Sequence, residues 1–232
     1  MPTSPGQTPK DSAPAETRPR KERKDNADKR RRQLLEATLE SVAKNGLART
    51  TLATVAAEAG LSQGVAVFYF KSKGGLLAAA LRAKYEQYEL IWQEALAAAP
   101  EDDPMAQIVA MVTADFSDTL CDPDAIATWF AFWGEQRFTP QYAQIAAEFD
   151  ARRHAAVADI CARLIGPARG AARPDLAERM ALWIDTFTDG LWQKLHLDPE
   201  GMAPEAALDL ALDFLDHMIA PQADPERPHA RR

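Results

Sequence analysis

Aromatic and acidic side chains are concentrated in the second half of the chain, where their types and spacing could bind an organic cation. Residues 128–133 are Thr-Trp-Phe-Ala-Phe-Trp, and all five tryptophans lie after residue 90. Carboxylates occur beside these stretches, since Asp115 precedes an aromatic residue and Asp189 precedes a tryptophan by about one helical turn. A quaternary ammonium has no N–H to donate, so aromatic faces and a nearby negative charge must hold it. The candidate cation site comprises Asp115, Trp129, Trp133, Asp189 and Trp192.

The same aromatic residues recur at helical spacing, which is also typical of a hydrophobic core. Apolar residues in the segments 105–120 and 180–195 are mostly three or four positions apart, and residues at this spacing share one face of a helix. Two interpretations therefore stay open. Either the tryptophans fill the core and the aspartates are solvated or lie at a subunit interface, or these residues surround a bound cation.

The sequence contains no motif that indicates catalysis. It has no glycine-rich phosphate loop, no HExxH zinc motif and no GxSxG nucleophile motif. The two cysteines lack metal-site spacing, and the four histidines are dispersed, with His154 expected in solvent. We expect a protein that is not an enzyme and that has no metal or other cofactor.

Charge is divided between a basic N-terminal part and an acidic remainder. Residues 1–75 contain 14 Lys and Arg against 8 Asp and Glu, whereas residues 76–232 contain 13 against 26. Cationic clusters bind nucleic acid phosphates by releasing condensed counterions. Charge alone leaves a membrane surface or RNA as alternatives to DNA, so a more specific motif must decide.

The most specific motif spans residues 50–73 and predicts two short helices joined by a tight turn. Thr50 or Thr51 can cap the first helix, Gly60 tolerates the left-handed backbone of the turn, and Ser62 is expected to cap the second helix. Such a helix-turn-helix lays its second helix in the major groove of DNA. An ordinary corner between two helices is the alternative.

The second helix of this motif begins with little bulk, so its surface can approach base edges. Gln63 can hydrogen-bond to adenine, and Val65 can contact a thymine methyl group. Gly64 and Ala66 complete this small surface. We therefore expect sequence-specific recognition of double-stranded DNA.

Helical periodicity continues through the chain and predicts an all-α fold, with a three-helix DNA-binding domain, a C-terminal helical bundle and about nine helices in total. Alanine, the best helix former, is abundant, and no segment alternates like a strand. The expected helices span residues 28–45, 51–59, 62–70, 73–99, 104–121, 124–136, 140–165, 175–197 and 204–219. The expected organisation is a disordered basic arm at 1–27, a DNA-binding domain at 28–73, a ligand-binding and dimerisation domain at 74–220 and a tail at 221–232.

A set of residues in and after the helix-turn-helix matches a known pattern: Thr50, Thr51, Leu52, Val55, Ala56, Ala59, Gly60, Leu61, Ser62, Gly64, Phe70, Lys73, Leu76 and Leu77. In these residues the sequence resembles the TetR family of bacterial transcriptional regulators. The resemblance implies that residues 63–67 face bases. It also implies contacts to DNA phosphates from Thr50, Thr51, Ser62, Tyr69 and Lys73.

Three aromatic segments carry a finer resemblance: residues 115–116, 128–133 and 188–192. In these segments the sequence is similar to the BetI type of that family, the choline-responsive repressors of glycine-betaine synthesis. The resemblance implies a repressor that a small ligand releases, with choline or a related quaternary ammonium as the effector. The alternatives are another organic cation, an aromatic metabolite, or a helical DNA-binding protein that senses no ligand.

A homodimer would suit a palindromic operator, because its two recognition helices would meet equivalent half-sites. We expect the helices at 175–197 and 204–219 to form the interface, the latter with an apolar stripe of Leu208, Leu212 and Leu215. No stretch approaches the ~18 apolar residues of a membrane helix, and the first residues lack a signal peptide. The two cysteines are isolated in the sequence, which favours a reducing compartment. We therefore expect a cytoplasmic protein without a membrane partner.

Overall fold

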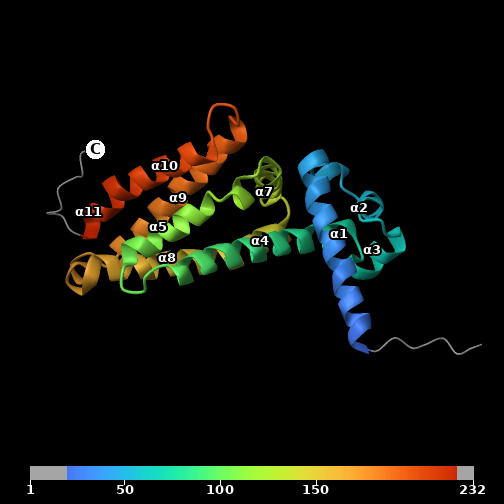
Figure 1. Cartoon of the computed structure of the whole chain (residues 1–232), viewed down its shortest axis with the longest axis horizontal. Helices are drawn as coiled ribbons and strands as arrows, with labels where there is room; N and C mark the ends of the chain where they lie inside the picture. Colours follow the sequence, from blue (N-terminus) through green and yellow to red (C-terminus); the bar gives the residue numbers. More distant parts are fainter. Residues whose placement is uncertain (1–19, 224–232) are drawn as a thin grey trace, which may run out of the picture.

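The computed structural model describes residues 20–223, and all regular secondary structure in this range is helical (Figure 1). The α-helices are α1 (Arg20–Arg49), α2 (Leu52–Glu58), α3 (Gln63–Phe70), α4 (Lys73–Ala98), α5 (Pro104–Asp115), α6 (Asp118–Cys121), α7 (Pro123–Glu135), α8 (Pro140–Ala172), α9 (Leu176–Leu197), α10 (Pro204–Phe214) and α11 (Ala220–Ala223). A π-helical segment, η1 (Leu215–Ile219), joins the last two. The expected all-α fold is confirmed.

The first three helices and the start of α4 form a small head with its own core. Leu34, Val55, Ala66 and Leu76, one from each of these helices, are fully buried. The turn between α2 and α3 depends on Gly60, whose φ of 65° lies in the left-handed region that L side chains rarely adopt. A helix-turn-helix is thus present where the sequence predicted it.

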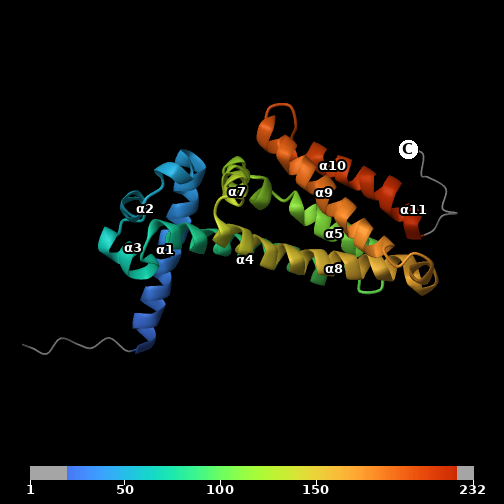
Figure 2. The ribbon, with the colours of Figure 1, turned by 180° about the vertical axis from the view of Figure 1, so that it is seen from behind.

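The remaining helices form a bundle at the other end of α4, as both ribbon views show (Figures 1 and 2). Because α4 has 26 residues, it is roughly 39 Å long and belongs to both parts. Its N-terminal turns pack in the head, while Leu81, Tyr85 and Trp92 are buried in the bundle core. Helix α1 also packs directly on α7, so the two parts meet along a second contact.

The helix boundaries differ from the expected ones at both ends of the described chain. Helix α1 begins at Arg20, so residues 20–27, which the sequence assigned to a disordered arm, are helical. The rest of that arm, residues 1–19, lies outside the described residues. The helix expected at 204–219 continues through η1 into α11, and residues 224–232 of the expected tail are likewise not described.

Two internal boundaries also differ. The helix expected at 104–121 is interrupted after Asp115, because Phe116 and Ser117 leave the helical path before α6 begins. The loop expected after Ile165 is mostly helical, with a sharp kink at Gly166, whose φ is 71°. No helix in residues 20–223 is long and apolar enough to cross a membrane.

Gly75 allows α3 and α4 to approach each other closely. A Cβ at this position would lie 2.3 Å from the carbonyl oxygen of Phe70, a backbone atom that cannot turn aside. At the adjacent Gly74 the nearest atom would be Ser72 Oγ at 3.9 Å, an ordinary contact. Only one of these two glycines is therefore required by sterics.

Gly75→Ala should destabilise the protein by roughly 1–3 kcal/mol, because relieving the clash must shift backbone. Gly74→Ala, the matched control in the same helical turn, should leave stability unchanged or raise it by up to about 1 kcal/mol through helix propensity. Urea unfolding followed by circular dichroism measures both. Equal midpoints for the two variants would contradict the assigned packing.

Candidate functional site

Helix α3 presents one exposed face that runs along its whole length. Gln63, Gly64, Val67 and Phe68 are exposed, whereas Ala66 points into the head and has no exposed surface. The expectation that Ala66 faces bases is therefore wrong for its side chain, because it belongs to the core stripe of the helix. The exposed stripe instead continues to Phe68, which is 69% exposed.

The hydroxyl groups of two predicted phosphate-contacting residues already form hydrogen bonds within the protein. Thr50 is fully buried, and its Oγ1 donates to the carbonyl oxygen of Gly46 at 3.0 Å. It is therefore a structural residue, and its predicted contact with DNA is wrong for the side chain. Thr51 is the N-cap of α2 and forms a reciprocal capping box with Thr54, accepting from the Thr54 N–H at 3.1 Å.

The other predicted DNA contacts remain accessible. Ser62 occupies the N-cap position of α3, but its side chain makes no capping hydrogen bond, unlike the expectation from the sequence, and it is exposed. Val65 and Tyr69 are partly exposed on the flanks of α3. Lys73 begins α4, and its Nζ donates to the carbonyl oxygen of Ala48 at 2.7 Å, which holds this cation beside the last turn of α1.

The bundle contains a cavity of about 340 Å³ among α4, α5, α7, α8 and α9. Its lining residues are Tyr85, Tyr88, Asp115, Trp129, Trp133, Gln136, Asp150, Arg153, Asp185, Thr188, Asp189 and Trp192. All five residues of the candidate cation site are among them. Residues from three separate parts of the sequence are thus brought to one cavity.

Three indoles of the cavity wall lie at nearly equal separations. Ring centroids are 6.1 Å apart for Trp129 and Trp133, 6.2 Å for Trp129 and Trp192, and 6.2 Å for Trp133 and Trp192. Tyr85 packs edge-on against Trp129 at 4.7 Å, and Tyr88 lies 6.0 Å from the same ring. Since aromatic rings attract cations over their faces within about 6 Å, this wall suits a cationic guest.

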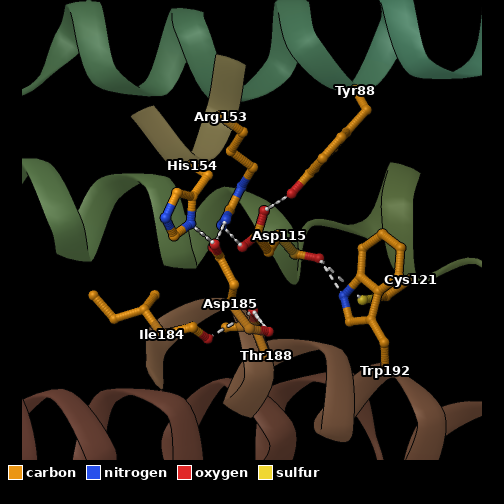
Figure 3. A network of polar contacts seen from close by, with 9 residues as sticks. All are labelled: Tyr88, Asp115, Cys121, Arg153, His154, Ile184, Asp185, Thr188 and Trp192. Atoms are coloured by element: carbon orange, nitrogen blue, oxygen red, sulfur yellow. Dashed lines mark hydrogen bonds and ion pairs between the residues drawn. The ribbon is translucent and has the colours of Figure 1, made fainter. Parts of the chain in front are cut away.

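A buried network of polar contacts forms another part of the wall (Figure 3). Arg153 donates to the carboxylates of Asp115, at 2.5 Å, and Asp185. The Tyr88 hydroxyl donates to Asp115 at 2.8 Å, and Trp192 Nε1 donates to the Asp115 carbonyl oxygen at 3.0 Å. Burial raises the pKa of Asp115 although Arg153 lies against it. The carboxylate of Asp115 is therefore already compensated within the protein.

Two further carboxylates of the cavity have no ion-pair partner among the described residues. Asp150 and Asp189 line the cavity yet remain exposed to solvent, so they lie at its mouth. Desolvation at the cavity wall raises the pKa of each to about 6, while Arg153 opposes the shift. Both are mostly ionised at neutral pH, and the mouth is consequently acidic.

His154 is not the solvated residue that the sequence suggested. Its Nδ1 is 2.7 Å from a carboxylate oxygen of Asp185, and its Nε2 is 3.1 Å from Glu178. The hydrogen bond with Asp185 is the main cause of its raised pKa. His154 thus contacts one carboxylate oxygen of Asp185 while Arg153 donates to the other (Figure 3).

Sequence reasoning missed several residues of the cavity. Tyr85 and Tyr88 are three positions apart on α4, a spacing that could have indicated a shared face. Arg153 gave no such signal, because its neighbours Arg152 and His154 are also polar and the local pattern resembles a solvated helix turn. Its burial depends on partners that are distant in the sequence.

A helix-turn-helix head linked by one long helix to a bundle with an internal cavity defines a DNA-binding regulator of the ligand-responsive class. Residues 34–80 match the family described as "Bacterial regulatory proteins, tetR family". Residues 104–220 match the family described as "BetI-type transcriptional repressor, C-terminal". The chain therefore belongs to the TetR family of transcriptional regulators, and within it to the BetI type of repressor.

Curated relatives agree with this assignment over most of the chain. The sequence is 35% identical over 195 residues to the HTH-type transcriptional regulator BetI of Burkholderia mallei, covering 83% of this chain and 95% of that protein. It is 31% identical over 194 residues to the protein of the same name in Pseudomonas paraeruginosa, covering 84% and 95%.

Solved structures share the fold. A transcriptional regulator from Pseudomonas aeruginosa PAO1 superposes with a TM-score of 0.70 at 24% identity, covering 86% of this chain and 95% of that chain. A regulator from Saccharomonospora viridis, solved in complex with choline, gives a TM-score of 0.70 at 20% identity, covering 82% and 97%. Because both structures are less than 25% identical to this chain, their similarity shows the fold alone.

Asp189→Asn should stabilise the ligand-free protein at pH 7.5 but not at pH 4. The folded state raises the pKa of Asp189 to about 6, so ionising this group costs the folded state stability. That cost is absent below the ordinary Asp pKa of about 4, grows as the pH rises from about 4 to 6, and stays constant above the folded-state pKa. Thermal unfolding at both pH values tests this, with Asp102→Asn, an exposed loop residue, as control. A rise in Tm that is equal at both pH values would contradict it.

Proposed function

We propose that this repressor leaves its operator when choline, or a closely related quaternary ammonium, occupies the cavity. The observation that carries the proposal is the group of three indoles at nearly equal separations beside two carboxylates, Asp150 and Asp189, that form no ion pair within residues 20–223. A trimethylammonium group offers only methyl surface and a diffuse charge. Aromatic faces and distant carboxylates suit it better than directional hydrogen bonds do.

The counter-charge is best assigned to Asp189 together with Asp150. Asp115 was the other candidate from the sequence, but it already pairs with Arg153 and accepts from Tyr88. Asp189 and Asp150 have no ion-pair partner in the described part of the chain, and both lie at the mouth. A cation entering between them would exchange water for the rings while keeping a negative charge nearby.

Choline is favoured over other organic cations and over aromatic metabolites by the relatives. The curated relatives, which are 35% and 31% identical to this chain, are transcriptional regulators named BetI. A structural neighbour was solved with choline bound. An uncharged aromatic metabolite would leave the acidic mouth without a partner, which makes it the weaker alternative.

The cavity is connected to the head by two helices. Tyr85 and Tyr88 extend from α4, which continues into the head, and Trp129 and Trp133 extend from α7, which packs on α1. A ligand that draws these rings together would change the relation of α4 to α7. We propose that the resulting movement of the two heads lowers operator affinity, since the ligand binds one arrangement better than the other.

Choline should bind saturably with a micromolar Kd, which corresponds to about 8 kcal/mol. Its neutral carbon isostere 3,3-dimethylbutan-1-ol should bind about 30-fold or more weakly, since one desolvated cation–π contact is worth about 2 kcal/mol. Choline affinity should also rise between pH 5 and 7, because Asp150 and Asp189, each with a pKa raised to about 6, become ionised. Calorimetric titration measures all three.

Trp192→Ala should weaken choline binding at least tenfold while leaving operator affinity of the ligand-free protein near normal. Trp183→Ala provides a matched control, because Trp183 is on the same helix α9 but does not line the cavity. Equal binding of choline and its neutral isostere would mean that the tryptophans serve as hydrophobic core alone.

For the operator, we propose that Gln63, Gly64, Val65 and the exposed Val67 and Phe68 meet base edges. Phosphate contacts are assigned to the main chain or side chains of Thr51, Ser62, Tyr69 and Lys73. Support comes from the exposure of these residues on and beside α3. A helix start with exposed N–H groups can itself bind a phosphate.

Lys73→Ala should weaken binding to all DNA sequences similarly and reduce the salt dependence by roughly one unit of slope, because one phosphate contact is lost. Gln63→Ala should instead relax the preference at one base position. Fluorescence anisotropy across a salt titration, with operator and single-base variants, separates the two effects. Wild-type behaviour of both mutants would overturn this placement of the recognition helix.

We propose a two-fold dimer through α9 and α10, but not through the leucine stripe expected from the sequence. Leu215 is 1% exposed, and Leu208 and Leu212 pack against the protomer's own core. Leu182 on α9, Leu210 on α10 and Met218 on η1 are instead 57%, 44% and 48% exposed. A monomer in sedimentation at micromolar concentration, with operator binding intact, would contradict this assembly.

A further inference from the structure

Two buried hydrogen-bond donors in the cavity wall have no partner among the described residues. They are Trp129 Nε1 and Arg153 Nε, and these side chains are 1% and 7% exposed. Native proteins rarely leave buried donors unpaired, and protein, water or ligand supplies the acceptor. Trp192 shows the contrast, since its Nε1 donates to the carbonyl oxygen of Asp115.

Both donors belong to residues of the same cavity. Trp129 and Arg153 both line it, and both lie against the same ring. The centroid of Trp129 is 6.0 Å from that of Tyr88, and the guanidinium carbon of Arg153 is 5.9 Å from it. The other buried atom of this kind, Ser117 Oγ, is not in a cavity residue. The unpartnered donor nitrogens of the described residues therefore both belong to the cavity wall.

The charge of the wall decides what kind of acceptor fits. The single positive charge of Arg153 already faces Asp115 and Asp185. Asp150 and Asp189 add two more carboxylates to the same cavity. A ligand carboxylate would enter an environment with an excess of negative charge and would be repelled. An uncharged oxygen, as in a hydroxyl or carbonyl group, accepts hydrogen bonds without this cost.

We infer that the ligand carries, besides its cationic head, an uncharged oxygen that accepts a hydrogen bond from Trp129 Nε1, with Arg153 Nε as a second donor. The inference rests on the proposed function, in which the cavity binds a quaternary ammonium. It deepens that proposal by making the site selective for an alcohol or aldehyde of this kind. A zwitterion that bears a carboxylate, such as glycine betaine, is then discriminated against by the acidic wall.

The experiment compares choline with trimethylpropylammonium, in which a methyl group replaces the hydroxyl and the cationic head is unchanged. Calorimetric titration of the wild-type protein should give roughly tenfold tighter binding of choline, because an apolar group cannot replace the water that otherwise meets the buried donors. Glycine betaine should bind more weakly than choline. These comparisons need no variant of the protein.

Trp129→Phe then tests the donor, because phenylalanine keeps an aromatic ring but lacks the indole N–H. Choline should bind this variant within about threefold of trimethylpropylammonium, while the smaller ring weakens the contact with the cationic head equally for both ligands. Trp133→Phe is the matched control, since Trp133 lines the same cavity and its nitrogen is not an unpartnered buried donor. It should keep the wild-type ratio between the two cations.

The outcomes separate the inference from the function on which it rests. Equal and tight binding of both cations to the wild type would overturn the acceptor oxygen and leave the cation site standing. Binding of neither cation would overturn the proposed function itself. A tenfold preference that persists in Trp129→Phe would remove Trp129 as the donor, and tight binding of glycine betaine would overturn the requirement for an uncharged oxygen.

Discussion

Arg153 introduces a full positive charge into the centre of the bundle, and the cavity is organised around the groups that neutralise it. Asp115 on α5 and Asp185 on α9 accept from its guanidinium, and Tyr88 on α4 donates to Asp115. An uncompensated charge at this depth would cost several kcal/mol. Helices α4, α5, α8 and α9 are therefore held in one mutual arrangement, because a shift of any of them would leave a buried charged or polar group unpaired.

The aromatic wall is held by this network and also contacts α4, the helix that enters the head. Trp192 is fixed by its hydrogen bond to the Asp115 main chain, and Trp129 lies between Tyr85, Tyr88 and the other two indoles. Lys84 on α4 also lies 4.9 Å from the centre of the Trp129 ring. Its ammonium is nearly buried, and desolvation lowers its pKa to about 8. One indole on α7 is thus in contact with several side chains of the helix that enters the DNA-binding head.

The sequence was sufficient for the fold because the fold depends on local signals. Helical periodicity, first-turn prolines and Gly60 mark the helices and the turn, and the cavity's five predicted residues were found from residue type and helical spacing. What it could not supply is pairing between distant segments. From the sequence, Arg153 and His154 resemble solvated residues. In the structure Arg153 pairs with Asp115, 38 positions away, and His154 pairs with Asp185, 31 positions away. Likewise Thr50 and Ala66 have types suited to a DNA surface, and only packing in the head shows that they are buried.

Core and proposed binding site are the same residues here, and the physics of a cation without N–H groups explains why they can be. Such a guest makes no directional hydrogen bond through its head, so its affinity depends on how accurately ring faces are positioned before it arrives. Trp129 is 1% exposed and packed edge-on by Tyr85 at 4.7 Å, which immobilises the ring at no cost to binding. A loose loop carrying the same tryptophans would have to be ordered by the ligand. The helical spacing that made a plain hydrophobic core a reasonable interpretation of the sequence produces tight packing. A rigid receptor for a quaternary ammonium requires the same tight packing.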